Sequence, residues 1–513
     1  MNKHFLPQIC CLFFLFFGTI SLQAQKYFYE TVTKEDAQKY LTTLYTNMQV
    51  LHPNLYQYFS KEDYDRVYDE LLHNLDTADY YASRKLLLTF QEFEALCRDG
   101  HSGVGLSQFP MKVNKKAKEQ NNASVQSNPP FRAFPFVFNI VKGKLYVNYH
   151  CFGEDTIPIK SEIVSIGEET AQEWLQRKRA SLSGERDEYR NSKLNGLRNI
   201  SSRLLNIDSC KFGYVPDGSR DTLYKILDCK TQREYFMNCY SKHFDEPGIF
   251  RDRTVEDMLV FRMIDDESIG IITMLSFLPV KKMLPLINKA FDNLKFYGAE
   301  DLIIDLRKSP GGHAESGYAI IDRITDKPYR THSEEQFFIK SAMLTSSNKY
   351  MRKIWQNRTY LNKKELIPIM QAGRDTIIVH QYPEIKPKSH KNKFTGRVWV
   401  LVGSQTFSAA VGLAAIVQDN KLGIVVGEET GGIPNTYGNP MSQILSGVLD
   451  EKLITFYYFF PHIKYIRPSG DDSMKLRGVI PDIEIEPNIL FNDDKQLETL
   501  IEIIREKWKK KDE

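Results

Sequence analysis

A strand-to-helix junction around Ser408 limits the folds open to this 513-residue chain. Residues 398–402 have the sequence Val-Trp-Val-Leu-Val, and a continuous apolar run of this length predicts a buried strand. The positions after Ser408 are mostly small, with alanine or glycine at 409, 410, 412, 414 and 415. Such a run favours a helix that packs closely on its neighbours, so Ser408 is expected where a buried strand turns into a helix.

Two interpretations of Ser408 follow from this position. The first N–H groups of a helix have no partner within the helix and can receive an anion. A hydroxyl group beside them can act as a nucleophile next to a ready-made oxyanion site. Alternatively, Ser408 only caps the helix, which serine does well.

The N-terminus predicts export of the chain. Lys3 and His4 precede an apolar stretch at residues 5–22 that Pro7 and Gly18 interrupt, and Ala24 then offers a small residue before a polar segment. This pattern is typical of a signal peptide cleaved after residue 24. The alternative, a membrane anchor, would require a longer apolar stretch, and no later stretch could span a bilayer. We therefore expect a periplasmic or secreted protein that is not membrane-bound after cleavage.

Charge and ligand-forming residues exclude several classes of partner. The net charge of +3 is small for this length and gives no argument for nucleic acid. The five cysteines outside the signal segment are scattered, so we expect no disulfide framework, although one bridge among Cys210, Cys229 and Cys239 stays open. The histidines form no HExxH-like pair, so we expect no metal site and no cofactor.

The hydrophobic patterns divide the chain into successive regions. After the signal peptide at 1–24, residues 25–110 are expected to be helical. Residues 111–230 are expected to form a linker and a small β-rich module. Residues 231–490 alternate strands and helices, which argues for an α/β core. Residues 491–513 predict a charged C-terminal helix.

Two further loops carry candidate site residues. The predicted strand at 302–306 runs into a loop with Gly311 and Gly312, whose backbone N–H groups can approach a substrate closely. The predicted helix before residue 98 ends at Asp99-Gly100, and His101 follows at once. A lone histidine in such a turn is either structural or a catalytic base.

Four segments resemble the tail-specific, or carboxyl-terminal processing, serine peptidases. They are 305–312 (Asp-Leu-Arg-Lys-Ser-Pro-Gly-Gly), 406–410 (Thr-Phe-Ser-Ala-Ala), 427–432 (Gly-Glu-Glu-Thr-Gly-Gly) and 478–482 (Gly-Val-Ile-Pro-Asp). The resemblance implies a crotonase-like ββα catalytic core with an N-terminal helical region. It also implies that the β-rich module is a PDZ-like insertion, although residues 161–169 lack the usual Asn-Gly after the isoleucine.

The same resemblance implies the roles of the site residues. One branch of the family uses a lysine about 25 residues after the serine, but that position is Ile433 and no lysine lies nearby. The other branch, similar to tricorn protease, takes a histidine in an Asp-Gly-His context, which Asp99-Gly-His101 matches. The resemblance therefore implies Ser408 as nucleophile and His101 as general base, with oxyanion donors among the N–H groups of Gly311, Gly312 and Ala409.

The acid that would orient His101 has no match in the expected place. Relatives in the tricorn-like branch carry a glutamate a few residues before the Gly-Val-x-Pro-Asp motif, where this chain has Met474-Lys475-Leu476-Arg477. Asp471 and Asp472 lie slightly earlier, and we predict that one of them orients His101. The alternative is that both belong to a solvated acidic turn.

Together these patterns predict a secreted or periplasmic serine endopeptidase that cleaves peptides or unfolded protein tails. Two alternatives stay open, because a fold does not determine a function. One is a non-catalytic peptide-binding protein, which Lys475 in place of the acid favours. The other is a protein that binds small hydrophobic ligands, as the retinoid-binding protein resembling this family does. The oligomeric state cannot be deduced from the sequence.

Overall fold

The computed structural model of the chain describes most of the regions predicted to be folded. The predicted signal peptide, all of the predicted linker at 111–130, and Cys239 lie outside the described residues. Among the helices that are described, none is long and apolar enough to cross a membrane. The described residues are 31–107, 132–150, 152–153, 156–195, 207–231, 234, 238, 254–264, 268–340, 374–445, 455–491 and 493–512.

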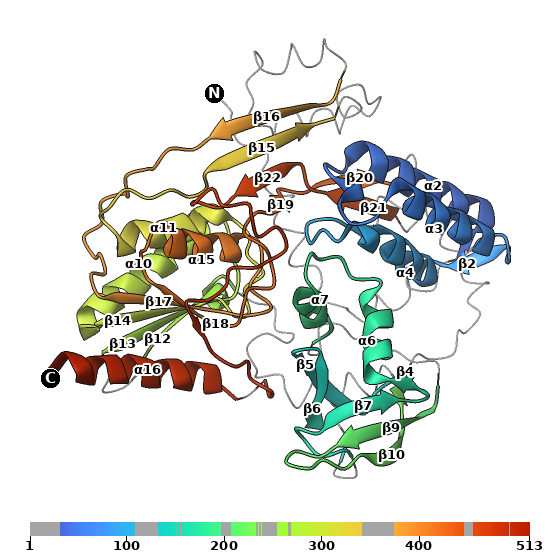
Figure 1. Ribbon diagram of the computed structural model, residues 1–513, viewed down its shortest axis with the longest axis horizontal. Coiled ribbons are helices and arrows are strands. Elements are labelled where there is room, and N and C mark those ends of the chain that lie inside the picture. Colours follow the sequence, from blue (N-terminus) through green and yellow to red (C-terminus); the bar gives the residue numbers. More distant parts are fainter. Residues whose placement is uncertain are drawn as a thin grey trace, which may run out of the picture.

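A six-stranded sheet forms the centre of the α/β region, as the alternating strand and helix patterns predicted (Figure 1). Its order is β12-β13-β14-β17-β18-β23, with β12 antiparallel to β13 and every other neighbouring pair parallel. The parallel strands are apolar on both faces because both faces are covered. The strands are β12 (Leu259–Ile264), β13 (Ile269–Met274), β14 (Asp301–Asp305), β17 (Arg397–Val402), β18 (Ile424–Gly427) and β23 (Ile483–Glu484).

Helices cover the two faces of this sheet unequally. One face carries α10 (Val280–Tyr297), α11 (Ala314–Ile324) and α15 (Ala409–Asp419), which share one buried core with the sheet. The other face packs against α16 (Lys495–Asp512), whose Leu497, Leu500 and Ile504 meet Trp399 of β17 (Figure 1). The predicted helix over 314–324 and the predicted C-terminal charged helix are therefore confirmed.

The N-terminal region is helical, as predicted, and packs on a second sheet. Helices α2 and α4 share a core with the three-stranded sheet β20-β21-β3. Thr33 and Ser60 cap α2 and α3 through their side chains, and the Ser60 cap is a full capping box. The elements are β1 (Thr31–Thr33), α2 (Lys34–Leu51), η2 (Leu55–Gln57), α3 (Lys61–Asn74), β2 (Tyr80–Ala82), α4 (Ser83–Glu94), η3 (Ala95–Cys97), β3 (Gly103–Ser107), β20 (Met441–Ile444) and β21 (Thr455–Phe460).

A third part, which we call the inserted module, comprises the described residues from 132 to 231. Its sheet has the order β10-β9-β7-β6-β5, with β8 paired to β7, and α6 packs on it through Trp174 and Leu175. Helix α7 lies between this sheet and the rest of the molecule (Figure 1). The elements are β4 (Arg132–Ala133), β5 (Phe136–Val141), β6 (Lys144–His150), β7 (Glu162–Ile166), β8 (Glu169–Thr170), α6 (Ala171–Arg179), α7 (Asp187–Leu194), β9 (Ser209–Val215), β10 (Leu223–Asp228) and β11 (Lys230–Thr231).

The polar stretch at 327–395 contains structure that the sequence patterns did not indicate. Strands β15 (Glu334–Ile339) and β16 (Thr376–Gln381) join β22 (Ile463–Ile466) and β19 (Tyr437–Gly438) in a four-stranded sheet. β16 is the edge strand and alternates half-buried with exposed residues, so it lacks the continuous apolar run that marks a buried strand. A short 3-10 helix, η7 (Glu256–Met258), precedes β12.

The cysteines that the structure describes form no disulfide. Cys97, Cys210 and Cys229 are buried free thiols, so the bridge between Cys210 and Cys229 that the sequence left open is absent.

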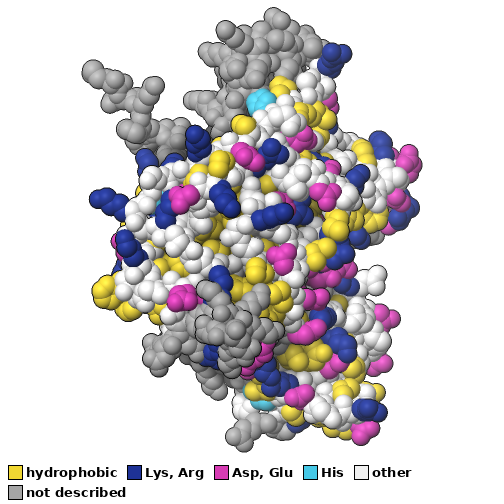
Figure 2. All heavy atoms as spheres, turned by 60° about the vertical axis from the view of Figure 1, so that its left-hand side comes forward, with side chains coloured by type: hydrophobic (Ala, Val, Ile, Leu, Met, Phe, Trp, Pro, Cys, Tyr) yellow, Lys and Arg dark blue, Asp and Glu magenta, His cyan; other side chains and the backbone are white. Residues whose placement is uncertain are grey.

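On the face shown in Figure 2, positive and negative side chains are interspersed and hydrophobic side chains lie between them. Neither sign of charge dominates that face.

Candidate active site

Ser408 lies at the predicted junction between β17 and α15, but it does not cap the helix. Its backbone has φ 54° and ψ −124°, and its side chain makes no capping hydrogen bond. A non-glycine residue in such a conformation is strained and persists only where the surrounding structure imposes it. The capping interpretation is therefore wrong, and the hydroxyl group is left half exposed and free for another partner.

Hydrogen bonds between two loops hold this backbone in place. The loops follow β14 and β17, which pair in parallel and so end at the same edge of the sheet. Thr406 Oγ1 donates to the carbonyl of Leu306 at 2.8 Å, and the N–H of Phe407 donates to the carbonyl of Ser309 at 3.0 Å. The N–H of Gly403 donates to Thr406 Oγ1 at 3.0 Å. The Ser408 loop is thereby tied to the loop that carries Gly311 and Gly312.

His101 reaches Ser408 from the N-terminal region. After η3, Arg98 adopts a left-handed conformation and turns the chain into β3. The N–H of His101 donates to Asp99 Oδ1 at 2.7 Å, which fixes the turn. His101 Nε2 then lies 2.9 Å from Ser408 Oγ, within reach for transfer of the hydroxyl proton.

An aromatic stack fixes the plane of the imidazole. The His101 ring lies 4.7 Å from the ring of Phe407, and Phe407 in turn stacks on Tyr189 at 4.2 Å with an interplanar angle of 5°. Tyr189 belongs to α7 of the inserted module. The module therefore packs directly behind the residue that precedes Ser408, and it is part of the wall of the site.

Two of the three residues expected to stabilise an oxyanion, Gly311 and Ala409, lie next to Ser408. Gly311 is buried so closely that a Cβ atom there would lie 2.6 Å from Ala409 N and 3.0 Å from Ser408 Cβ. Gly312 is exposed, and Ala409 is the first residue of α15. The Gly311 carbonyl accepts the Phe277 N–H and the Phe277 carbonyl accepts the His313 N–H, which anchors the strand edge around Gly312.

Asp471 and Asp472 do not orient His101, contrary to our prediction. Asp472 binds Lys464 Nζ at 3.1 Å and accepts from Asn435 Nδ2 at 3.1 Å, and Asp471 is exposed and accepts the Ser473 N–H. Both aspartates thus complete a local turn. Nearness in sequence to the Gly-Val-Ile-Pro-Asp segment does not translate into nearness to His101.

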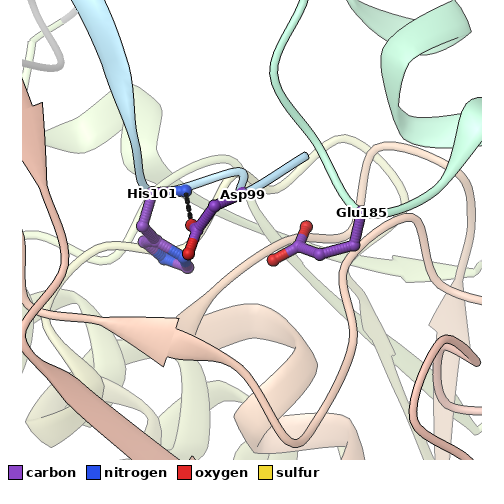
Figure 3. A group of neighbouring side chains, drawn as sticks. All are labelled: Asp99, His101 and Glu185. Carbon is purple, nitrogen blue, oxygen red and sulfur yellow. Dashed lines mark hydrogen bonds between the residues drawn. The ribbon is translucent and has the colours of Figure 1, made fainter. Parts of the chain in front are cut away.

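Other acidic residues lie beside His101. Asp99, His101 and Glu185 each place one polar atom within 4.8 Å of the others, and all three side chains are buried. Figure 3 shows the carboxyl group of Glu185 pointing toward Asp99 and the imidazole. Glu185 lies just before α7 in a Ser-Gly-Glu-Arg segment with no motif, so the sequence carried no signal for it. His52, also buried, places its Nε2 atom 3.5 Å from Asp99 Oδ2.

Burial shifts the pKa values of this group in opposite directions. It lowers the pKa of His101 to about 4, an effect that nearby Asp99 partly offsets. Burial and the Asp99 charge raise the pKa of Glu185 to about 7. Burial also lowers the pKa of Lys193, a residue of α7, to about 8. His101 is therefore neutral at pH 7, as a general base must be.

A cavity of about 360 Å³ opens behind this group. Asp99 and Glu185 form part of its wall, and Lys464, Asp472 and Lys475 form another part. The cavity does not touch Ser408 or His101, so it lies beside the reacting atoms rather than around them. It gives the buried carboxyl groups a route to solvent.

The described residues contain one group with the spacing of a metal site, and it is the Asp99, His101 and Glu185 group itself. A cation on His101 Nδ1 would leave the remaining proton on Nε2, where it would prevent the imidazole from accepting a proton from Ser408. If His101 acts as a base toward Ser408, a hydrogen-bonding group and not a cation must therefore occupy Nδ1.

Comparisons with known proteins agree with this geometry. Residues 268–485 match peptidase family S41, and this segment contains Ser408, Gly311 and Gly312. No curated protein matches the chain significantly. The crystal structure of mature CPAF is similar with a TM-score of 0.56 and 13% identity, over 88% of this chain and 92% of that chain. Mature CPAF complexed with lactacystin gives a TM-score of 0.57 and 13% identity, over 92% and 98%.

At 13% identity the likeness to CPAF establishes a shared fold and nothing more. The family match supplies the chemistry, because it includes the strands and loops that position the serine. Residues 268–485 of the chain carry a peptidase family S41 domain, and the protein is a serine-type peptidase.

Proposed function

We propose that this protein is an exported serine endopeptidase in which Ser408 is the nucleophile and His101 the general base. The observation that carries the proposal is the 2.9 Å contact between His101 Nε2 and Ser408 Oγ, made by a serine in a strained conformation. A binding protein needs neither the strain nor the contact, so both features favour the enzyme over the peptide-binding and hydrophobic-ligand alternatives.

The geometry supports acyl transfer in two steps. Ser408 Oγ attacks the carbonyl carbon of the scissile peptide bond while its proton passes to His101 Nε2. The N–H groups of Gly312 and Ala409 donate to the oxygen that becomes negative, with Gly311 keeping the two loops in contact. The imidazolium then protonates the leaving amine as the C–N bond breaks. A water molecule, deprotonated by His101, attacks the ester and releases Ser408, so that no metal or cofactor takes part.

The finer architectural assignments belong to the same proposal. The sheet with α10, α11 and α15 on one face corresponds to a crotonase-like ββα core, and the inserted module corresponds to a PDZ-like domain. The edge strand β10 would receive an extended peptide by strand addition, which suits peptides or unfolded protein tails as substrates. The N-terminal segment supports export of the protein. Mass analysis of the mature form should then give a chain that begins near residue 25. An intact N-terminus in the membrane fraction would contradict export with cleavage.

An active-site serine probe tests the central proposal. A fluorophosphonate should label the wild type once per chain at Ser408 and abolish hydrolysis of an unfolded protein substrate. Ser408→Ala should neither react nor hydrolyse. His73→Ala, an exposed histidine at the end of α3, is the control and should label at the wild-type rate. Equal labelling of the wild type and Ser408→Ala would show that the serine is not the nucleophile.

A further inference from the structure

Three buried polar atoms behind the catalytic pair have no hydrogen-bond partner among the described residues. They are His101 Nδ1, Asp99 Oδ2 and Glu185 Oε2. Their side chains come from the turn after η3 and from the segment before α7, and Figure 3 shows them converging. Buried polar atoms are costly unless paired, so this convergence calls for a proton or a hydrogen bond between them.

We propose that Glu185, which the inserted module brings to the site, is the positioning residue for His101. This inference rests on the proposed function, because it assigns the group that orients the general base. His101 must carry its proton on Nδ1 for Nε2 to accept the proton of Ser408, and an acceptor facing Nδ1 selects that tautomer.

Asp99 already has a donor facing each of its oxygens. Oδ1 accepts the backbone N–H of His101 at 2.7 Å. Oδ2 faces His52 Nε2 at 3.5 Å, and His52 Nδ1 accepts the Asn54 N–H, so the proton of a neutral His52 is on Nε2. Glu185 Oε2 has no hydrogen-bond partner among the described residues, so it is the oxygen that we assign as acceptor for His101 Nδ1–H.

Contacts of the inserted module hold Glu185 in position. Glu185 Oε1 accepts a long hydrogen bond from Thr436 Oγ1 at 3.4 Å. The next residue, Arg186, forms an ion pair with Glu429 of the α/β region. Tyr189 stacks on Phe407, and Lys193 donates to the Ser183 carbonyl. The carboxyl group therefore approaches His101 from a segment anchored at both ends.

Burial and a neighbouring charge hold back the ionisation of Glu185. Burial and the Asp99 charge raise the pKa of Glu185, while Lys193 and the backbone N–H groups of Glu185 and Gly100 partly offset the rise. Glu185 is therefore only partly ionised near pH 7, and its negative charge stabilises the imidazolium that forms during attack. The proton from Ser408 stays on His101, so the carboxyl pair orients the ring without receiving that proton. The titratable and charged groups that face the pair are His52, Tyr58, Arg98, His101, Tyr189, Lys193, Lys464, Asp472 and Lys475.

The isosteric variant Glu185→Gln tests the proposal in the full-length enzyme. We expect kcat to fall about 10- to 100-fold with KM within about 3-fold, because Asp99 still supplies one charge. In the wild type, kcat/KM should rise with pH through an ionisation near 7, as Glu185 gains its charge and strengthens the base. Glu185→Gln should lose this step, and Glu185→Asp, which keeps a carboxylate, should retain it.

Glu94→Gln is the matched control. Glu94 is a buried carboxyl group whose oxygens accept from Ser183 Oγ at 2.6 Å and Cys97 Sγ at 3.1 Å, and neither oxygen faces His101. It should keep both kcat and the ionisation near pH 7. If Glu94→Gln lowers kcat and removes the ionisation as Glu185→Gln does, the role of Glu185 is merely structural and the inference fails.

The outcomes separate the inference from the proposed function. The role of Glu185 alone is overturned if the wild type reacts with the fluorophosphonate and Glu185→Gln keeps the wild-type kcat and pH profile. A wild type with no reactive serine overturns both. The thermal midpoint and circular dichroism show whether Glu185→Gln folds. If it does not fold, Glu185→Asp decides the question. Loss of the ionisation near pH 7 in folded Glu185→Asp contradicts the inference.

Discussion

His101 Nε2 lies 2.9 Å from Ser408 Oγ although 307 positions separate the two residues in the chain. His101 is held by the turn after η3, and Ser408 by the loop between β17 and α15. This contact therefore exists only when the N-terminal helical region is docked on the α/β region. Three parts of the chain meet at this point, since Tyr189 and Glu185 come from the inserted module.

Removing either member of the pair should abolish turnover almost completely. Ser408→Ala and His101→Ala should each lower kcat by several orders of magnitude, because members of one catalytic unit act together. The double variant should be little slower than either single variant. Peptide hydrolysis measured for all three forms checks this, and near-normal activity in His101→Ala would contradict the assignment of the base.

The close approach at Gly311 should make this position intolerant of a side chain. In Gly311→Ala the new Cβ would lie 2.6 Å from backbone atoms of Phe407 and Ala409, and the residue has φ +84°. We expect the two loops to separate and labelling of Ser408 to fall at least about 100-fold, as with the loss of an oxyanion donor.

Gly298→Ala is the control for backbone strain alone. Gly298 has φ +67° with no atom within 4 Å of the added Cβ. It should cost about 1 kcal/mol of stability and leave the labelling rate unchanged. Equal labelling of the two alanine variants would mean that Gly311 does not position the site.

The correction at Asp472 has a direct kinetic consequence. Because Asp472 binds Lys464 and Asn435 rather than His101, Asp472→Asn should change kcat less than about 2-fold. An orienting carboxylate would instead cost orders of magnitude. Steady-state kinetics on a peptide substrate distinguish the two, and a loss of 100-fold or more would restore Asp472 as the orienting acid.

The raised pKa of Glu185 should appear in the pH dependence of stability. Its ordinary value of 4.5 is raised to about 7 in the folded protein, so the folded state binds a proton between these values that the unfolded state has released. Its contribution is fully present below pH 4.5 and is lost as the pH rises through 7. The free energy of unfolding that is lost over this pH range is about 3 kcal/mol.

Glu185→Gln has no such ionisation and isolates this effect. The stability of the wild type relative to Glu185→Gln should therefore fall between pH 5 and pH 8, as measured by thermal midpoints at each pH. If the stability difference between the wild type and Glu185→Gln stays constant from pH 5 to pH 8, the pKa of Glu185 is not raised in the folded protein.

Local patterns in the sequence were sufficient to predict the strand and helix that flank Ser408 and several other elements of the α/β region. The apolar run before Ser408 became β17, the small residues after it became α15, and the helix predicted over 314–324 has those bounds in the structure. His101 could be singled out because a helix stop precedes it. These features depend on hydrophobic periodicity and turn chemistry, which act over a few residues and are therefore visible in a single sequence.

Only the tertiary structure decided which acid faces His101. Asp472 was predicted from its nearness to a motif, yet it pairs with Lys464 eight positions away. Glu185 lies in a segment without a motif and reaches the site because α7 docks on Phe407. The strained backbone of Ser408 likewise arises from hydrogen bonds between loops about 100 positions apart. Such contacts depend on how separate parts of the chain pack, and no local pattern records them.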